Sequence, residues 1–231
     1  MACTAATCTS EPYTAQVCTL ALASHVSDIS NPLIATAQTT QYVYCIKREN
    51  FVGNTLYPLN IMKDMEAYKE IYEREVKKYK GREHVMQTII SVFDCLWNGV
   101  IFLCPLDPSL IHKELTDIGF NVPEVTFYKI PIEVIHEKRA TIWKYPEGGT
   151  NGRKVLPDDE FDDIHNYTEL KALPERTISY YRGVFAEHND PNKLPLKFAN
   201  IPHVMCADPI DITDSRITEV KWSEITSAVK T

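Results

Sequence analysis

The sequence lacks several features that would assign it to a functional class at once. No lysine or arginine precedes Lys47, so we expect no basic start of a secretory signal peptide. No apolar run approaches the ~18 residues that a transmembrane helix needs. The glycine-rich loops GxGxxG and GxxxxGK are absent, as are the GxSxG and HExxH signatures of hydrolases. These absences predict a cytoplasmic protein without a membrane partner, and they exclude the common nucleotide-binding loops.

The cysteines do not form a recognisable site. The chain has seven, and no two of them make a CxxC pair, which argues against a structural zinc site. An odd, scattered set is typical of a reducing compartment. Cys95 and Cys104 lie in apolar runs, so we expect both to be small core residues. A Ser-His-Asp or Cys-His arrangement assembled by the fold stays open, because such residues need not be neighbours in sequence.

Composition and charge fit an ordinary folded protein. With 231 residues, 44% hydrophobic and 24% charged, the chain can bury a substantial core without disulfide or metal staples. The formal net charge of −7 argues against a general nucleic-acid or membrane-surface binder, because both need a basic face. A local basic groove remains compatible with this charge.

The pattern of residues divides the chain into an N-terminal arm, 1–39, and a single domain, 40–231. The arm is rich in Thr, Ala and Ser, and we expect it to lie over the domain or to form a tail. Hydrophobic periodicity predicts the elements of the domain. Strands are expected at 41–47, 99–104, 125–135, 140–145, 201–206 and 217–222, and helices at 60–80, 85–96, 107–118 and 174–185. Because strands and helices do not alternate regularly, the class is α+β.

The sequence also predicts where one helix begins and ends, how two strands pair, and where a long loop lies. Asp107-Pro108 predicts a helix start, with an N-cap acceptor before proline, and Gly119 predicts the stop. The strands at 125–135 and 140–145 are expected to form a hairpin or a neighbouring pair. Residues 146–163 read as a loop, glycine-rich and then acidic. Its carboxylates lack the spacing of a calcium loop, so solvated charge is the simpler interpretation.

Two short polar stretches could bind a ligand. Arg82-Glu83-His84 follows a run of lysines and opens a predicted helix, where backbone N–H groups and an arginine could hold an anion. The alternative is a solvated helix end. Trp97-Asn98-Gly99 is equally ambiguous, because a tryptophan at that place is either a core residue or a stacking platform.

Two segments resemble parts of one known family. Val43–Phe51 (VYCIKRENF) is similar to the opening strand of ADP-ribosyltransferases of the DNA-modifying toxin type, and Asn54–Asn60 stands where that family has a short helix and turn. Pro202–Ile212 (PHVMCADPIDI) is similar to a late strand and loop of the same family and of its RES relatives. The resemblance implies a split mixed β-sheet with flanking helices, and NAD or a related nucleotide as the ligand.

The resemblance also implies a site, with two departures from the family. Position 45 is Cys where the family has His or Arg, and position 203 is His where it has the catalytic Glu. The implied catalytic residues are His203 and Arg82, and the implied nucleotide-binding residues are Tyr44, Cys45, Lys47, Arg48 and His84. Cys45 and His203 are expected to lie close together on adjacent strands.

The departure at position 203 bears on the chemistry. A neutral imidazole lacks the charge with which a carboxylate stabilises an oxocarbenium-like transition state. The domain therefore either binds a nucleotide without transferring anything, or runs altered chemistry with His203 as acid or base. Basic residues serve a nucleic-acid end in the RNA 2′-phosphotransferases, so such an end is a further partner that the resemblance implies.

Two other classes of function stay open. The Thr/Ala-rich arm, with 12 tyrosines and 14 prolines in the chain, is compatible with a non-catalytic structural or self-assembling protein, such as a viral one, that forms homo-oligomers through residues 1–39. The chain is also compatible with an enzyme of another type that uses a buried His or Cys.

Overall fold

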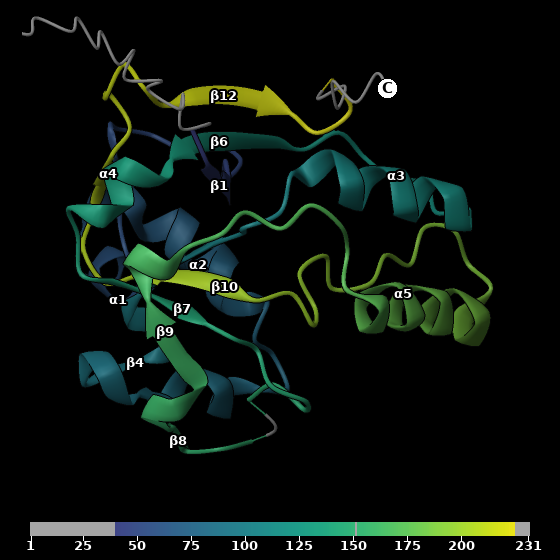
Figure 1. The fold of residues 1–231 in the computed structure, drawn as a ribbon, viewed down its shortest axis with the longest axis horizontal. Coiled ribbons are helices and arrows are strands. Elements are labelled where there is room, and N and C mark those ends of the chain that lie inside the picture. The colour runs from purple at the N-terminus through teal and green to yellow at the C-terminus, as the bar shows by residue number, and fades with distance from the viewer. Residues whose placement is uncertain (1–39, 151, 225–231) are drawn as a thin grey trace, which may run out of the picture. The chain divides into compact units, whose positions relative to one another are not determined.

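A computed structural model describes residues 40–150 and 152–224 (Figure 1). The predicted arm, 1–39, and its role in assembly lie outside these residues. The helices are α1 Leu59–Met62, α2 Lys69–Lys77, α3 Pro108–Ile118, α4 Ile132–His136 and α5 Glu175–His188. The strands are β1 Tyr42–Ile46, β2 Thr55–Leu56, β3 Ile89–Ile90, β4 Cys95–Leu96, β5 Ile101–Leu103, β6 Thr126–Pro131, β7 Ala140–Trp143, β8 Val155–Leu156, β9 Phe161–Asp163, β10 His203–Cys206, β11 Ile210–Asp211 and β12 Thr218–Lys221.

Several small sheets and the helices make this an α+β protein, as predicted. The two larger sheets are antiparallel, with strand orders β1-β6-β12 and β5-β10-β7-β9. Two backbone hydrogen bonds connect these sheets: Tyr44 N donates to Cys104 O at 2.9 Å, and Cys104 N donates to Tyr44 O at 2.8 Å. The strand pair β11-β2 and the mixed sheet β4-β3-β8 complete the set in the described residues.

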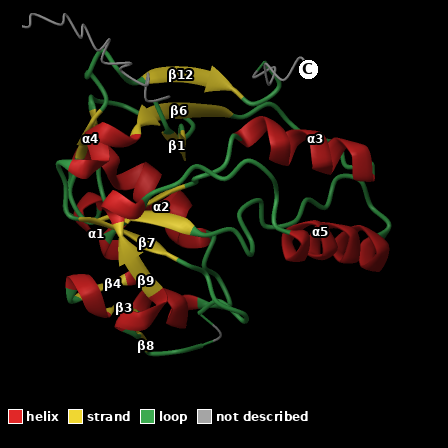
Figure 2. Cartoon of the chain, in the orientation of Figure 1, coloured by secondary structure: helices red, strands yellow, loops and turns green. Residues whose placement is uncertain are grey.

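Both faces of β1 are buried, which explains its dense apolar sequence. Successive side chains of a strand point to opposite faces. Val43 accordingly packs in one core cluster with Ile130 and Val204, whereas Tyr44 packs in another with Phe127 and Trp222. Burying a side chain of this size stabilises the fold by roughly 1.5–3 kcal/mol. The second cluster also contains the inner faces of α3 and α5, which lie side by side in Figure 2.

Helix α3 confirms the start and stop that its sequence predicts. Asp107 Oδ1 accepts a hydrogen bond from Ser109 N at 2.9 Å, and Pro108 occupies the first turn, where its missing N–H is not needed. Gly119 ends the helix at φ 110°, a left-handed conformation that favours glycine. The predicted strands at 41–47, 99–104, 201–206 and 217–222 and the helix at 174–185 are confirmed with small shifts of their ends.

The helix predicted at 85–96 is wrong. This segment forms short 3₁₀ turns, Glu83–Gln87 and Ser91–Phe93, around the strands β3 and β4. Its apolar residues do recur at helical spacing, but backbone pairing decides the structure: Ile89 N donates to Lys154 O at 2.8 Å and Trp97 N to Thr88 O at 2.7 Å. The β-branched run 88–90 favours this extended pairing.

The expected pairing of the segments 125–135 and 140–145 is also wrong. Strand β6 joins β1 and β12, whereas β7 joins β10 and β9. The five-residue helix α4, which begins after Pro131, turns the chain from one sheet to the other. Two smaller corrections concern the predicted helix 60–80, which breaks at an extended Met65, and the predicted loop 146–163, which contains β8 and β9.

A pair of glycine substitutions tests the contribution of the α3 stop. Gly119→Ala places a Cβ at positive φ and 3.3 Å from the Phe185 ring, so we expect the free energy of unfolding to fall by about 1 kcal/mol or more. Gly183→Ala, inside α5 with nothing within 4 Å, is expected to raise it by about 0.5–1 kcal/mol. Urea denaturation measures both. Equal effects of the two variants would contradict this explanation of the helix end.

Candidate functional site

One large cavity collects most of the residues that the sequence suggested. Its volume is about 1000 Å³, and its lining comes from β1 and the loop after it, from α2, from the turn Trp97–Gly99 and from β5 and residues 196–203. Six of the seven predicted site residues line this cavity: Tyr44, Cys45, Lys47, Arg48, Arg82 and His203. The seventh, His84, is exposed and is not among the lining residues.

The connection between the two larger sheets brings these residues together. Tyr44 on β1 pairs with Cys104 at the end of β5, and β10 runs antiparallel to β5 with Val204 opposite Leu103. His203 therefore begins the strand that lies on the other side of β5. The expectation that Cys45 and His203 occupy adjacent strands is wrong, because β5 separates β1 from β10, although both residues line the same cavity.

An aromatic group surrounds His203 within the lining. We use this name for Trp97, Phe102, Trp143, Tyr145, Phe198 and His203, all of which line the cavity. The Trp97 and Phe102 ring centroids are 4.5 Å apart, and the His203 ring lies 5.8 Å from Phe102. The His203 ring also stacks on Tyr145 at 5.9 Å. The half-buried rings of this group provide flat apolar surface for a planar ligand.

Tyr145 is held in a strained conformation. Its φ is 50°, which is unusual for a bulky residue and recurs at ligand sites. The Arg176 guanidinium lies 5.5 Å from the centre of its ring, and Arg176 Nη2 donates to its carbonyl oxygen. Gly149 packs against the same ring, with 3.1 Å between the position of a Cβ and the Tyr145 hydroxyl. The surroundings therefore impose the position of this side chain.

Helix α5 anchors the same part of the wall at further points. The Tyr181 hydroxyl donates to the Lys197 carbonyl, and Thr177 Oγ1 donates to Ala199 O at 3.1 Å. Arg176 Nε donates to Asn200 O at 3.1 Å. Side chains of one helix thus fix the backbone on both sides of Phe198.

His203 is neutral at ordinary pH. Burial lowers its pKa to about 4, because the charged imidazolium is poorly solvated among the rings. Its Nδ1 is buried and has no hydrogen-bond partner in the described residues. A neutral imidazole can donate or accept a hydrogen bond, but it supplies neither a cation nor an anion. It is also a weak general base at a pKa near 4.

A basic group makes up another part of the lining. Six basic residues line the cavity, Lys47, Arg48, Arg74, Lys78, Arg82 and Lys197, against three carboxylates, Glu49, Glu75 and Glu124. The cavity therefore carries an excess of positive charge in a chain whose net charge is −7. Such a local field attracts anions.

Arg48 and Arg82, the two arginines at the predicted site, have guanidinium N–H groups that are not used in ion pairs with carboxylates of the described residues. Within the described residues, Arg48 Nη1 donates to the Met62 sulfur at 3.2 Å, and Arg82 Nη2 donates to the Lys78 carbonyl at 3.2 Å. Neither arginine has a carboxylate partner among the described residues. By contrast, Lys47 is paired with Glu219 at 2.7 Å. Arg48 and Arg82 are therefore the cations best placed to take an anionic ligand.

Tyr79 connects the aromatic and basic groups. Its hydroxyl accepts a hydrogen bond from Trp97 Nε1 at 3.1 Å, and the Arg82 guanidinium lies 5.5 Å from its ring. Burial raises the pKa of Tyr79. Burial lowers the pKa of Lys197, and the nearby Lys78 lowers it further.

Groups that could act as a nucleophile or base are restrained. Burial raises the pKa of Cys45 to about 11 and that of Cys104 to about 12, so neither is a thiolate near neutral pH. Cys104 is buried as predicted, whereas Cys95 is only half-buried. Glu75, the carboxylate on α2, is paired with Lys78 at 2.7 Å. This arrangement favours ligand binding over nucleophilic catalysis.

Within 40–150 and 152–224, no group of three or more His, Cys, Asp or Glu side chains is arranged to hold a metal ion. None of the helices in the same ranges is long and apolar enough to cross a membrane.

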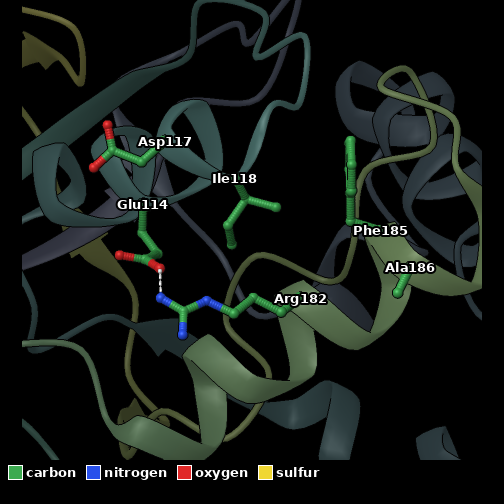
Figure 3. A pocket seen from close by; sticks show the side chains of 6 residues that line it. All are labelled: Glu114, Asp117, Ile118, Arg182, Phe185 and Ala186. Atoms are coloured by element: carbon green, nitrogen blue, oxygen red, sulfur yellow. Dashed lines mark hydrogen bonds and ion pairs between the residues drawn. The ribbon is translucent and has the colours of Figure 1, made fainter.

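A second, smaller cavity of about 410 Å³ lies between α3 and α5 (Figure 3). Its lining residues are Glu114, Asp117, Ile118, Arg182, Phe185 and Ala186. Arg182 Nη2 donates to Glu114 Oε1 at 3.3 Å across it, so its one guanidinium is already paired. None of the predicted site residues lines this cavity.

The aromatic group is the part of the site that sequence reasoning missed. Of its six members, the sequence points only to His203, through the resemblance, and to Trp97, for which core and stacking roles stay open. Trp143 and Tyr145 alternate at the end of a strand, and Phe102 lies in another, but their convergence depends on the pairing of β10 with both β5 and β7. A period-two pattern of aromatic residues was the available signal.

The comparisons with known proteins add no relative to these observations: no family model, no curated protein and no solved structure matches this chain.

The buried neutral state of His203 makes stability depend on pH. Its pKa in the folded state, about 4, lies below the unfolded value of about 6.5, so the unfolded chain binds the proton first. This contribution is complete above pH 6.5, and it is lost as the pH falls toward 4, by roughly 3 kcal/mol in total. Urea denaturation at pH 7.5 and 4.5 should show a smaller loss for His203→Gln than for the unsubstituted chain. Equal losses would contradict the neutral state, and so would an imidazole NMR titration near pH 6.5.

Proposed function

We propose that the domain binds NAD or a related pyrophosphate nucleotide in the large cavity, in an ADP-ribosyltransferase-like arrangement. The observation that carries this proposal is the joining of an aromatic group and two unpaired arginines in one cavity of about 1000 Å³. A nucleotide combines the same two chemistries, a planar base and an anionic phosphate. A free base or a simple anion would use only part of the lining.

The magnitudes favour a bound nucleotide. Stacking of a base on an aromatic side chain contributes about 1–3 kcal/mol. A hydrogen bond from a charged donor contributes about 1.5–3 kcal/mol, and arginine presents a planar fork that matches phosphate oxygens. The cavity lies at the upper end of the ~300–1000 Å³ typical of ligand sites, which suits a dinucleotide.

In this proposal each residue of the site has a separate role. Arg48 and Arg82 hold the phosphates, whereas Lys47 lines the cavity with its charge already compensated by Glu219. Tyr44 and Cys45 form the apolar wall near the joined sheets. His84 is not part of the proposed site, because it is exposed and does not line the cavity.

The convergence of β1 and the start of β10 on one cavity supports the proposed family arrangement. The two sheets that meet at Tyr44 and Cys104 support the split sheet that the resemblance implies. The chemistry is altered in the proposal, because His203 is a neutral imidazole where the family has a carboxylate. We therefore propose a nucleotide-binding domain in which ordinary ADP-ribosyl transfer is lost or much reduced.

Binding of NAD and its dependence on the arginines test the proposal. At a hundred times its Kd, NAD should stabilise the domain by about 2.7 kcal/mol in thermal unfolding. Arg48→Gln and Arg82→Gln should each weaken binding about tenfold or more by calorimetry, because each removes a charged donor to phosphate.

A surface arginine provides the matched control. Arg216 is paired with Asp214 at 2.6 Å and does not line the cavity, so Arg216→Gln should leave the Kd unchanged. Absence of any NAD binding at millimolar concentration would overturn the proposal. Equal weakening by all three substitutions would assign the effect to overall charge rather than to this site.

A further inference from the structure

Lys197 is a cation in the lining of the large cavity that has no acidic partner among the described residues. It belongs to the segment between α5 and β10, and its side chain is half-buried. Its Nζ lies 5.9 Å from the centre of the Trp222 ring, and the Tyr181 hydroxyl donates to its carbonyl oxygen. A charge withdrawn from water costs free energy unless it is paired. Lys197 therefore has the capacity to bind an anion that the protein itself does not supply.

A second lysine lies near Lys197 in the same lining. Lys78 caps the end of α2, far from Lys197 in sequence, and also lines the cavity. The lowered pKa of Lys197 has two causes, first its burial and then the positive charge of Lys78. Because charges shift a pKa only when they are close, the fold brings two like charges together at this wall. Such a pair favours an anion beside it.

The carboxylates of the lining leave this pair with excess positive charge. Glu75 is shared, because its Oε1 lies 2.7 Å from Lys78 Nζ and 3.9 Å from Arg74 Nε. The other two carboxylates of the lining form no ion pair with Lys78 or Lys197. One carboxylate thus compensates two cations of α2 and its end, and Lys197 is left uncompensated.

The lysine pair is adjacent to one of the arginines of the proposed nucleotide site. Arg82 Nη2 donates to the Lys78 carbonyl at 3.2 Å, so this guanidinium contacts the residue that carries one of the lysines. A ligand whose pyrophosphate is held at Arg82 would therefore have a neighbouring group within reach of the pair. An ammonium group is a compact charge with three rotatable donors. A phosphate monoester carries nearly two negative charges at pH 7 and matches two such groups.

We propose that Lys78 and Lys197 form a subsite for a phosphate monoester on the ribose of the bound nucleotide. The ligand is then a pyrophosphate nucleotide phosphorylated at a ribose 2′- or 3′-hydroxyl, because a single sugar separates such a phosphate from the pyrophosphate at Arg48 and Arg82. The subsite rests on the proposed nucleotide site and deepens it, because it names a third anionic group of the ligand.

Two matched ligand pairs test the subsite. NADP is compared with NAD, which lacks its 2′-phosphate, and coenzyme A with 3′-dephospho-coenzyme A, which lacks its 3′-phosphate. Calorimetry should show the phosphorylated member of at least one pair binding about tenfold tighter or more, because the monoester gains hydrogen bonds from charged donors. The pair that shows the preference identifies the position of the phosphate on the ribose.

Substitutions of the two lysines separate charge from packing. Lys197→Met keeps an apolar stem over Trp222, so it should remove most of the preference without lowering the melting temperature. Lys197→Gln tests the same loss if the methionine variant does not fold. Lys78→Gln should also reduce the preference, whereas Lys197→Arg, which keeps the charge, should retain it. Lys113→Met is the matched control, because Lys113 is exposed, paired with Asp117 and outside the lining of the large cavity.

The outcomes distinguish the subsite from the nucleotide site on which it rests. Binding of NAD with no preference within either pair overturns the subsite and leaves the nucleotide site standing. A preference that survives substitution of both lysines, or that falls equally in Lys113→Met, overturns their role in it. Failure of NAD and of the other three ligands to bind overturns both proposals.

Discussion

The pair of backbone hydrogen bonds between Tyr44 and Cys104 is the constraint on which the site depends. It is the contact at which the sheet β1-β6-β12 meets the sheet β5-β10-β7-β9. Together with the core cluster that Val43 and Ile130 share with Val204, it fixes the basic residues that follow β1 relative to the rings carried by β5, β7 and β10. Its strength comes from burial, because both residues are almost fully covered and water cannot compete for their backbone groups.

Two kinds of surface are kept apart within the cavity and joined at one residue. The rings exclude charge strongly enough to keep His203 neutral, whereas Arg48 and Arg82 remain without carboxylate partners in the described part of the chain. Tyr79 contacts both groups through its hydroxyl and its ring. This separation matches the proposed nucleotide ligand, which is flat at one end and anionic at the other.

Local signals predicted much of the fold, and tertiary pairing decided the rest. The ends of α3 follow from Asp107, Pro108 and Gly119, whose capping chemistry needs no distant partner. The segment 85–96 has an apolar period compatible with a helix, but its backbone pairs with residue 154. No local pattern in the sequence predicts this distant pairing. The predicted residues on and after β1 line the large cavity together because the resemblance from which they came covers one short, continuous stretch. The other four rings of the aromatic group were missed, because strands far apart in the chain bring the group together.

Helix α5 has a consequence for how this protein tolerates change. Arg176, Thr177 and Tyr181 fix the carbonyl groups of residues 145, 197, 199 and 200, although none of these three side chains lines the cavity. These hydrogen bonds make α5 the support of the cavity wall that contains Tyr145 and residues 197–200. Substitutions on its inner face would change the shape of the cavity without touching a ligand. Substitutions on its outer face are expected to leave the shape of the cavity unchanged.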